Sequence, residues 1–226
     1  MGLNQYAARE PRTLPIFILA DTSGSMKGEK INELNIALRE MLRALNEVKD
    51  IRGTFQLCII SFGGRVKVEQ PLADIDKISL TELHANWDTP MGGAFDMVRE
   101  MIEDRTVVSS RSYAPTIVLI SDGLPTDYSG TNYAQWDALR KLHQEGRSSK
   151  SQRLALGIGN DADFEMLKEF IHTDGIPVIK TGDASGIAAF FRWVTMSTIA
   201  RMNSINPNAT STVAPIFDMD DEDIII

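Results

Sequence analysis

The feature that most constrains the fold is a pair of short, almost entirely apolar segments that each end in a polar loop. Residues 14–20 run directly into Asp21, and residues 116–120 run into Ser121 and Asp122. An unbroken apolar run of this length is typical of a strand buried on both faces, as in a parallel sheet covered by helices. The two segments therefore predict the centre of such a sheet.

Helix-like and strand-like patterns alternate along most of the chain. Apolar residues recur at helical spacing over residues 31–48, 94–102, about 136–142, 164–171 and 187–201. Further strand-like runs lie at 55–62, 153–158 and 177–179. Gly63 and Gly64 predict a tight hairpin turn into one antiparallel strand at residues 66–68. Together these patterns predict an α/β fold: a Rossmann-like, doubly wound, mostly parallel sheet with one antiparallel edge strand and helices on both faces.

The length of 226 residues suits one large domain with extensions. We expect an N-terminal arm over residues 1–13, a single domain over 14–202, and a flexible acidic tail over 203–226. The tail contains five acidic residues among the six from Asp218 to Asp223. One hypothesis is that this run supplies a carboxylate to a metal, and a solvated tail is the alternative.

Composition narrows the partners and the compartment. The net charge of -8 argues against nucleic acid as the main partner, because phosphate binding needs a basic face. The single cysteine, Cys58, rules out a disulfide within the chain. No apolar run approaches the ~20 residues of a membrane span, and the N-terminus has no secretory pattern. We therefore expect a cytoplasmic protein without a membrane span.

Oxygen-bearing side chains gather in the loops that follow the buried strands or precede helices. They are Asp21, Ser23, Ser25, Thr89 and Asp122. In open parallel sheets, ligands bind beyond the carboxyl ends of the strands, so the fold would bring these loops together. Carboxylate and hydroxyl oxygens suit Mg2+, with Mn2+ and Ca2+ as alternatives, and disfavour zinc. We also expect Gly24 and Gly123 to permit a close approach of the loops.

Plainer roles compete with the metal reading. Ser and Asp residues favour helix N-caps, and Thr89 followed by Pro90 predicts a capped helix start. Capping needs only one residue of the first loop, however, and does not account for the three loops together. The three histidines, His84, His143 and His172, lie far apart in sequence, so we expect surface or packing roles for them.

The residues Asp21-Thr22-Ser23-Gly24-Ser25 match the DxSxS signature of the von Willebrand factor A family, and the resemblance covers about residues 14–200. Thr89 and Asp122 fall where that family places its other two ligands. The resemblance implies a metal-ion-dependent adhesion site (MIDAS) with direct coordination by Ser23 and Ser25. Asp21 and Asp122 would act mainly through waters or hydrogen bonds, and an acidic residue from a partner protein would complete the coordination.

Finer details resemble one branch, the TerY-like proteins of bacterial tellurium-resistance clusters. The segments concerned are 89–92, 121–127 and 157–163. This resemblance implies a non-enzymatic, cytoplasmic adaptor in a stress response, with protein kinase and PP2C-type phosphatase partners. Asp88 departs from the pattern, because many relatives carry a small residue there.

The alternative function is a Mg2+-dependent phosphohydrolase similar to the haloacid dehalogenases. Such an enzyme needs a second Asp two residues after the first, as nucleophile and general acid. In this chain that position is Ser23. The residues therefore favour a binding module over an enzyme.

Overall fold

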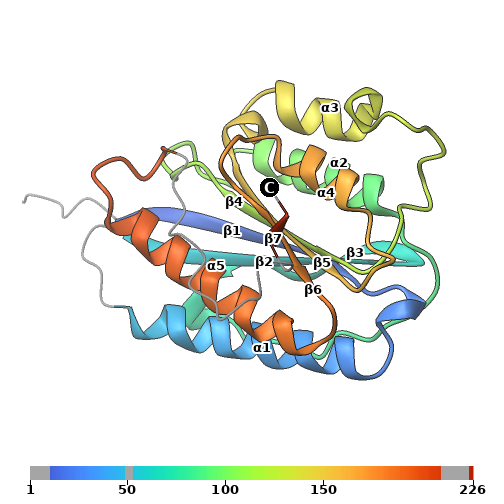
Figure 1. Cartoon of the computed structure of the whole chain (residues 1–226). Coiled ribbons are helices and arrows are strands. Elements are labelled where there is room, and N and C mark those ends of the chain that lie inside the picture. The colour runs from blue at the N-terminus through green and yellow to red at the C-terminus, as the bar shows by residue number, and fades with distance from the viewer. Residues whose placement is uncertain (1–10, 49–52, 210–223, 226) are drawn as a thin grey trace, which may run out of the picture.

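The computed structural model describes residues 11–48, 53–209 and 224–225, which form one sheet between two layers of helices (Figure 1). The strands are β1 (Arg12–Asp21), β2 (Gly53–Gly63), β3 (Arg65–Asp74), β4 (Thr116–Ser121), β5 (Gln152–Ile158), β6 (Val178–Thr181) and β7 (Ile224–Ile225). The helices are α1 (Glu29–Glu47), α2 (Met91–Glu103), α3 (Asp137–Gln144), α4 (Phe164–Ile171) and α5 (Ser185–Asn203). Short 3-10 turns are η1 (Gly24–Met26), η2 (Ile75–Lys77), η3 (Tyr133–Gln135) and η4 (Ser148–Lys150).

The sheet has the strand order β3-β2-β1-β4-β5-β6-β7. β1 pairs in parallel with both β2 and β4, and the parallel pairing continues through β5 and β6. β3 is the antiparallel edge strand, joined to β2 by the turn at Gly64. The predicted doubly wound, mostly parallel sheet is therefore confirmed. The two-residue β7, antiparallel to β6 at the opposite edge, was not predicted.

Each face of the sheet has its own apolar layer. Leu14, Ile16 and Ile18 of β1 pack into the layer that contains α1 and α5. Their neighbours Phe17 and Leu19 pack into the layer that contains α2, α3 and α4. Figure 1 shows α1 and α5 together on one side of the sheet and the other three helices opposite. Because successive side chains of a strand point to opposite faces, covering both faces requires the unbroken apolar sequence of β1.

The chain reverses its direction of travel across the sheet at β1 and β4. From β1 the chain moves to β2 on one side, and it later returns to add β4 on the other side. The register pairs Ala20 with Ile120, so the polar residues that follow these two strands leave the sheet side by side. This crevice is the usual ligand position in open α/β sheets.

The ends of the domain differ from the expected boundaries. β1 already begins at Arg12, inside the segment predicted as an arm. At the other end, residues beyond α5 remain attached: Arg201 Nε donates to the Pro207 carbonyl at 2.6 Å, and Ala114 N–H donates to Asn208 Oδ1 at 2.9 Å. Two residues of the predicted tail form β7. The acidic run at 218–223 lies outside the described residues, so its proposed contact with a metal stays a hypothesis.

Candidate metal centre

Asp21 anchors the loop after β1, the first of the three loops that carry the predicted metal ligands. Its carboxylate is fully buried at the end of β1, and both oxygens accept hydrogen bonds. Oδ1 accepts from the backbone N–H of Ser23 at 2.8 Å, and Oδ2 accepts from Ser121 Oγ at 2.6 Å. Asp21 therefore shapes its own loop and ties it to the end of β4.

Burial raises the pKa of Asp21 from 3.8 to about 6. Burial outweighs the hydrogen bonds from Ser121 and Ser23, which lower the pKa, and the nearby charge of Asp122 contributes a smaller part of the rise. A carboxylate withdrawn from water holds its charge more easily when a cation lies beside it. The electrostatics of this position therefore favour a nearby cation.

The hydroxyls of the first loop connect it to Asp122. Ser23 Oγ lies 3.0 Å from Ser25 Oγ, and Ser25 Oγ donates to Asp122 Oδ1 at 2.7 Å. Asp122 is almost fully buried just beyond β4. Two predicted ligand segments, 97 residues apart in sequence for Ser25 and Asp122, thus meet in one hydrogen-bonded chain.

The backbone holds Thr89 beside these two loops. Its N–H donates to Thr126 Oγ1 at 3.1 Å, and its carbonyl accepts from Thr126 N–H at 2.9 Å. Two residues earlier, the Trp87 carbonyl accepts from Gly24 N–H at 2.9 Å. The segment that carries Thr89 is therefore joined to both the β1 loop and the β4 loop, and Thr89 itself is buried.

The predicted cap at Thr89 is wrong. α2 begins at Met91, and its N-cap is Pro90, whose side chain makes no capping bond. The carboxylate of Asp127 instead accepts from the N–H groups of Gly92 and Gly93, at 3.1 and 3.0 Å. Ser23 likewise stands at the N-cap of η1 without a capping bond from its side chain. Helix capping therefore does not explain these hydroxyls.

The expected role of Gly24 and Gly123 is also wrong. A Cβ at Gly24 would make only an ordinary contact, 3.7 Å from the Trp87 carbonyl oxygen, and one at Gly123 would meet nothing within 4 Å. The close approach occurs at Gly63, where a Cβ would lie far inside contact distance of Thr22. A residue without a side chain is thus required at Gly63, where β2 enters the turn to β3.

Sequence reasoning missed three residues that organise the site. Ser121 binds Asp21, Asp127 caps α2, and Lys30 Nζ donates to Asp122 Oδ2 at 2.6 Å. Ser121 and Asp127 lie in the segment that carries Asp122, so their position was a usable signal. Lys30 sits at the start of α1, where nothing in the helical pattern separates it from a solvated lysine.

The rim of the site exposes apolar and charged groups. Trp87 has 73% of its surface exposed and a left-handed backbone (φ 59°), and Leu124 is 62% exposed. Next to Trp87 lies an open hollow of about 540 Å³ that Arg65 and Asp88 also line. A tryptophan held outward by its backbone beside a charged hollow is suited to contact with another protein.

The residues present fit a hard divalent cation. The hydroxyls of Ser23 and Ser25 and the carboxylates of Asp21 and Asp122 converge at one edge of the sheet, and Thr89 lies on the adjoining segment. All of these donors are oxygens, as Mg2+ and Mn2+ require. Their geometry is that of a small oxygen-lined site.

Comparison with known proteins places this architecture in a class. Residues 16–124 match the von Willebrand factor type A domain family, a span that contains all five oxygen-bearing residues. This part of the chain is therefore similar to von Willebrand factor type A domains. A curated relative, inter-alpha-trypsin inhibitor heavy chain H4 of Sus scrofa, is 27% identical over 168 residues. That match spans 71% of this chain but only 17% of the relative.

Solved structures share the fold at low sequence identity. The ArnB paralog VWA2 from Sulfolobus acidocaldarius has a TM-score of 0.60 at 19% identity, over 83% of this chain and 46% of that one. Proximal thread matrix protein 1 from the mussel byssus, with a zinc-occupied MIDAS motif, has a TM-score of 0.60 at 19% identity, over 84% and 48%. The manganese-loaded TRAP protein of Plasmodium vivax has a TM-score of 0.56 at 17% identity, over 79% and 72%.

Proposed function

We propose that this domain binds Mg2+ through Ser23, Ser25 and Thr89, and uses the bound metal to capture an acidic side chain of a partner protein. The observation that carries the proposal is the hydrogen-bonded chain from Ser23 through Ser25 to Asp122, beside the buried carboxylate of Asp21. Mn2+ or Ca2+ would suit the same oxygens, and two structural neighbours are described with zinc or manganese.

The hydrogen bonds of the chain's own carboxylates support binding over catalysis. The two carboxylates are engaged by hydrogen bonds to Ser23, Ser25, Ser121 and Lys30, so neither is placed as a free nucleophile or base. A divalent metal supplies a positive centre that accepts one more carboxylate oxygen. Trp87 and Leu124 would then pack against the apolar surface around the partner's acidic residue.

The wider role extends this proposal. By resemblance to the TerY-like branch, the domain would act in the cytoplasm as an adaptor in a bacterial tellurium-resistance or stress response. Its partners would be a protein kinase and a PP2C-type phosphatase. Among the described residues, no helix is long and apolar enough to cross a membrane.

Thermal melting with and without Mg2+ tests the metal site. Metal at ~100 times its dissociation constant adds about 2.7 kcal/mol to the free energy of unfolding. For a domain of this size that is a rise of roughly 5–10 °C in Tm. The rise should disappear in Ser23→Ala and Asp21→Asn but persist in Ser149→Ala, whose hydroxyl bonds the Gly146 carbonyl before β5, at the opposite edge of the sheet.

Partner capture is tested with the same variants. Co-purification with a candidate kinase or phosphatase should require Mg2+, and both EDTA and Ser23→Ala should abolish it. Binding that is equally strong in EDTA would refute a metal-mediated contact. Metal-dependent hydrolysis of a generic phosphate ester, lost in Asp21→Asn, would favour the phosphohydrolase alternative.

A further inference from the structure

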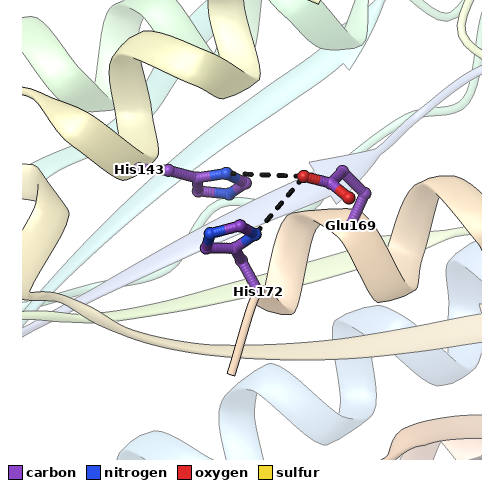
Figure 2. A group of neighbouring side chains, drawn as sticks. All are labelled: His143, Glu169 and His172. Carbon is purple, nitrogen blue, oxygen red and sulfur yellow. Dashed lines mark ion pairs between the residues drawn. The ribbon is translucent and has the colours of Figure 1, made fainter. Parts of the chain in front are cut away.

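A second group of side chains that could hold a metal lies on α3 and α4. It is separate from the oxygen-lined site of Asp21, Ser23, Ser25, Thr89 and Asp122, called the oxygen site below. It consists of His143 near the end of α3 and of Glu169 and His172 at the end of α4 (Figure 2). Glu169 Oε1 is 3.3 Å from His172 Nδ1 and 3.9 Å from His143 Nδ1. One ligand atom from each residue lies within 4.8 Å of the other two. No sequence pattern predicts this group, because its residues belong to two separate helical segments.

The two sites lie at opposite ends of the parallel strands. The end of α4 leads into the start of β6, and the end of α3 leads through η4 into the start of β5. The histidine cluster therefore lies near the amino ends of these strands, whereas Asp21 and Asp122 follow the carboxyl ends of β1 and β4. Ligation at one site does not use residues of the other.

The hydrogen bonds of His143 determine which of its nitrogens is free. Nε2 lies 3.1 Å from the carbonyl oxygen of Phe170. Because a carbonyl only accepts, Nε2 carries the hydrogen, and in the neutral ring Nδ1 then presents a lone pair. Burial, with smaller contributions from the nearby charges of Arg153 and His172, lowers the pKa of His143 to about 4.

The free lone pair of His143 faces a carboxylate. Nδ1 of His143 and Oε1 of Glu169 both accept hydrogen bonds, and a cation between them would satisfy both. Histidines that bind metals usually donate their second ring N–H to a carbonyl or carboxylate, which fixes the tautomer. The contact between His143 Nε2 and Phe170 O has this arrangement.

His172 completes the cluster through an unusual backbone conformation. It ends α4 in the left-handed region (φ 47°), which non-glycine residues adopt infrequently. Its ring stacks on that of His143, with centroids 4.4 Å apart and planes 12° from parallel. The His172 side chain is 54% exposed, whereas that of His143 is 3% exposed. The cluster is therefore anchored on its buried side and open to solvent on the other.

We propose that His143, Glu169 and His172 form a second metal site, for Zn2+ or a similar transition metal, that joins the ends of α3 and α4. Two imidazole nitrogens and one carboxylate oxygen are a common zinc ligand set, with water in the fourth position. Adjacent ligands of tetrahedral zinc are about 3.4 Å apart at normal bond lengths. The 3.3 Å distance matches this value. The 3.9 Å distance and the stacked rings mean that the imidazoles would rotate out of their stack to direct both lone pairs at one ion.

One nearby charge opposes the cation. Arg153 is buried beside His143, and its Nε donates to the Ile171 carbonyl at 3.1 Å. Glu169 offsets this charge and is the one carboxylate of the cluster. The alternative is that Glu169 and His172 form only an ion pair and bind no zinc.

The test is zinc binding to the untagged full chain in the presence of excess Mg2+. Because a structural neighbour holds zinc at its MIDAS motif, the two sites must be separated by variants. Zinc binding should weaken at least tenfold in Glu169→Gln and in His172→Asn, where asparagine tolerates the left-handed backbone. It should be unchanged in Ser23→Ala and in the control His84→Ala.

Cobalt substitution gives an independent readout. Co2+ at this site should give the intense visible absorption of tetrahedral cobalt, and Glu169→Gln should remove it while the circular dichroism of the fold stays the same. No zinc binding by the wild-type chain would overturn the proposal. So would zinc binding that is lost in Ser23→Ala and retained in Glu169→Gln, because the zinc would then sit at the oxygen site.

Discussion

At the scale of single residues, Lys30 partly neutralises the negative charge of the oxygen site. Its ammonium group donates to one oxygen of Asp122, and the Ser25 hydroxyl donates to the other. The Lys30 side chain is 30% exposed, whereas that of Asp122 is fully buried. A divalent cation beside Asp122 would thus share a buried carboxylate with a lysine and be repelled by it. Lys30 should weaken metal binding while stabilising the metal-free domain.

We therefore expect Lys30→Met to bind Mg2+ more tightly, by about tenfold, which corresponds to about 1.4 kcal/mol. Isothermal titration at pH 7.5 measures the change directly. Lys27→Met is the matched control, since Lys27 is exposed just before α1 and should alter the affinity little. Weaker binding in Lys30→Met would mean instead that the lysine positions Asp122 for the metal.

The sequence predicted which oxygen-bearing residues meet, but not how they are held. Asp21, Ser23, Ser25 and Asp122 follow strands whose apolar patterns predict a parallel sheet, and the carboxyl ends of parallel strands lie on the same side of the sheet. The contacts of Lys30 depend on one rotamer at the start of a helix, which no periodicity encodes. No pattern predicts the cluster of His143, Glu169 and His172 for a related reason: it depends on how the ends of α3 and α4 meet.

The β2–β3 hairpin supports the oxygen site at the scale of secondary structure elements. Its turn packs against the loop after β1, where the Phe62 carbonyl accepts from Thr22 N–H at 3.3 Å. Gly64 has φ 69°, and its N–H donates to the Asp88 carbonyl at 2.9 Å. The hairpin thus touches both the segment of Ser23 and that of Thr89.

Gly63→Ala should destabilise the domain, because the new Cβ would collide with the backbone and side chain of Thr22. Overpacking of this kind costs about 1–3 kcal/mol, or roughly 2–12 °C in Tm for a domain of this size. Mg2+ affinity should fall as well, since Thr22 lies between Asp21 and Ser23. Gly182→Ala, whose Cβ would meet nothing within 4 Å, should leave both quantities unchanged. Equal Tm values for the two variants would contradict the expected clash.

Sequence predicts best those elements whose pattern of burial is uniform along their length. β1 and β4 are buried on both faces and α1 has one apolar side, so their composition determines their structure. β3 was placed only over its first residues, because this edge strand mixes polar and apolar side chains and continues to Asp74. The pairing of Ile224 with Ile179 depends on where the chain returns, which local sequence does not specify.

Stability and metal binding are separated at the scale of the whole molecule. Arg201 of α5 is 1% exposed and binds two segments near the amino ends of the parallel strands, the start of β4 and the stretch after α5. Its guanidinium donates to the Ala114 carbonyl at 2.6 Å, to Thr116 Oγ1 at 2.8 Å and to the Pro207 carbonyl at 2.6 Å. Thr116 begins β4, whereas Asp122 follows its end. Arg201 therefore fastens the last helix at the edge opposite to the oxygen site.

Arg201→Met should lower the free energy of unfolding by about 2–5 kcal/mol, because it leaves buried acceptors without a donor. The midpoint should fall by roughly 4–20 °C, with Mg2+ affinity unchanged. Ser23→Ala should do the reverse and lose the metal with little change in the metal-free midpoint. Arg192→Met, at an exposed position of α5, controls for loss of charge on that helix. Weaker Mg2+ binding in Arg201→Met would contradict this separation. It would mean that α5 is coupled to the metal site, because Arg201 and the site lie at opposite ends of β4 and share no contact.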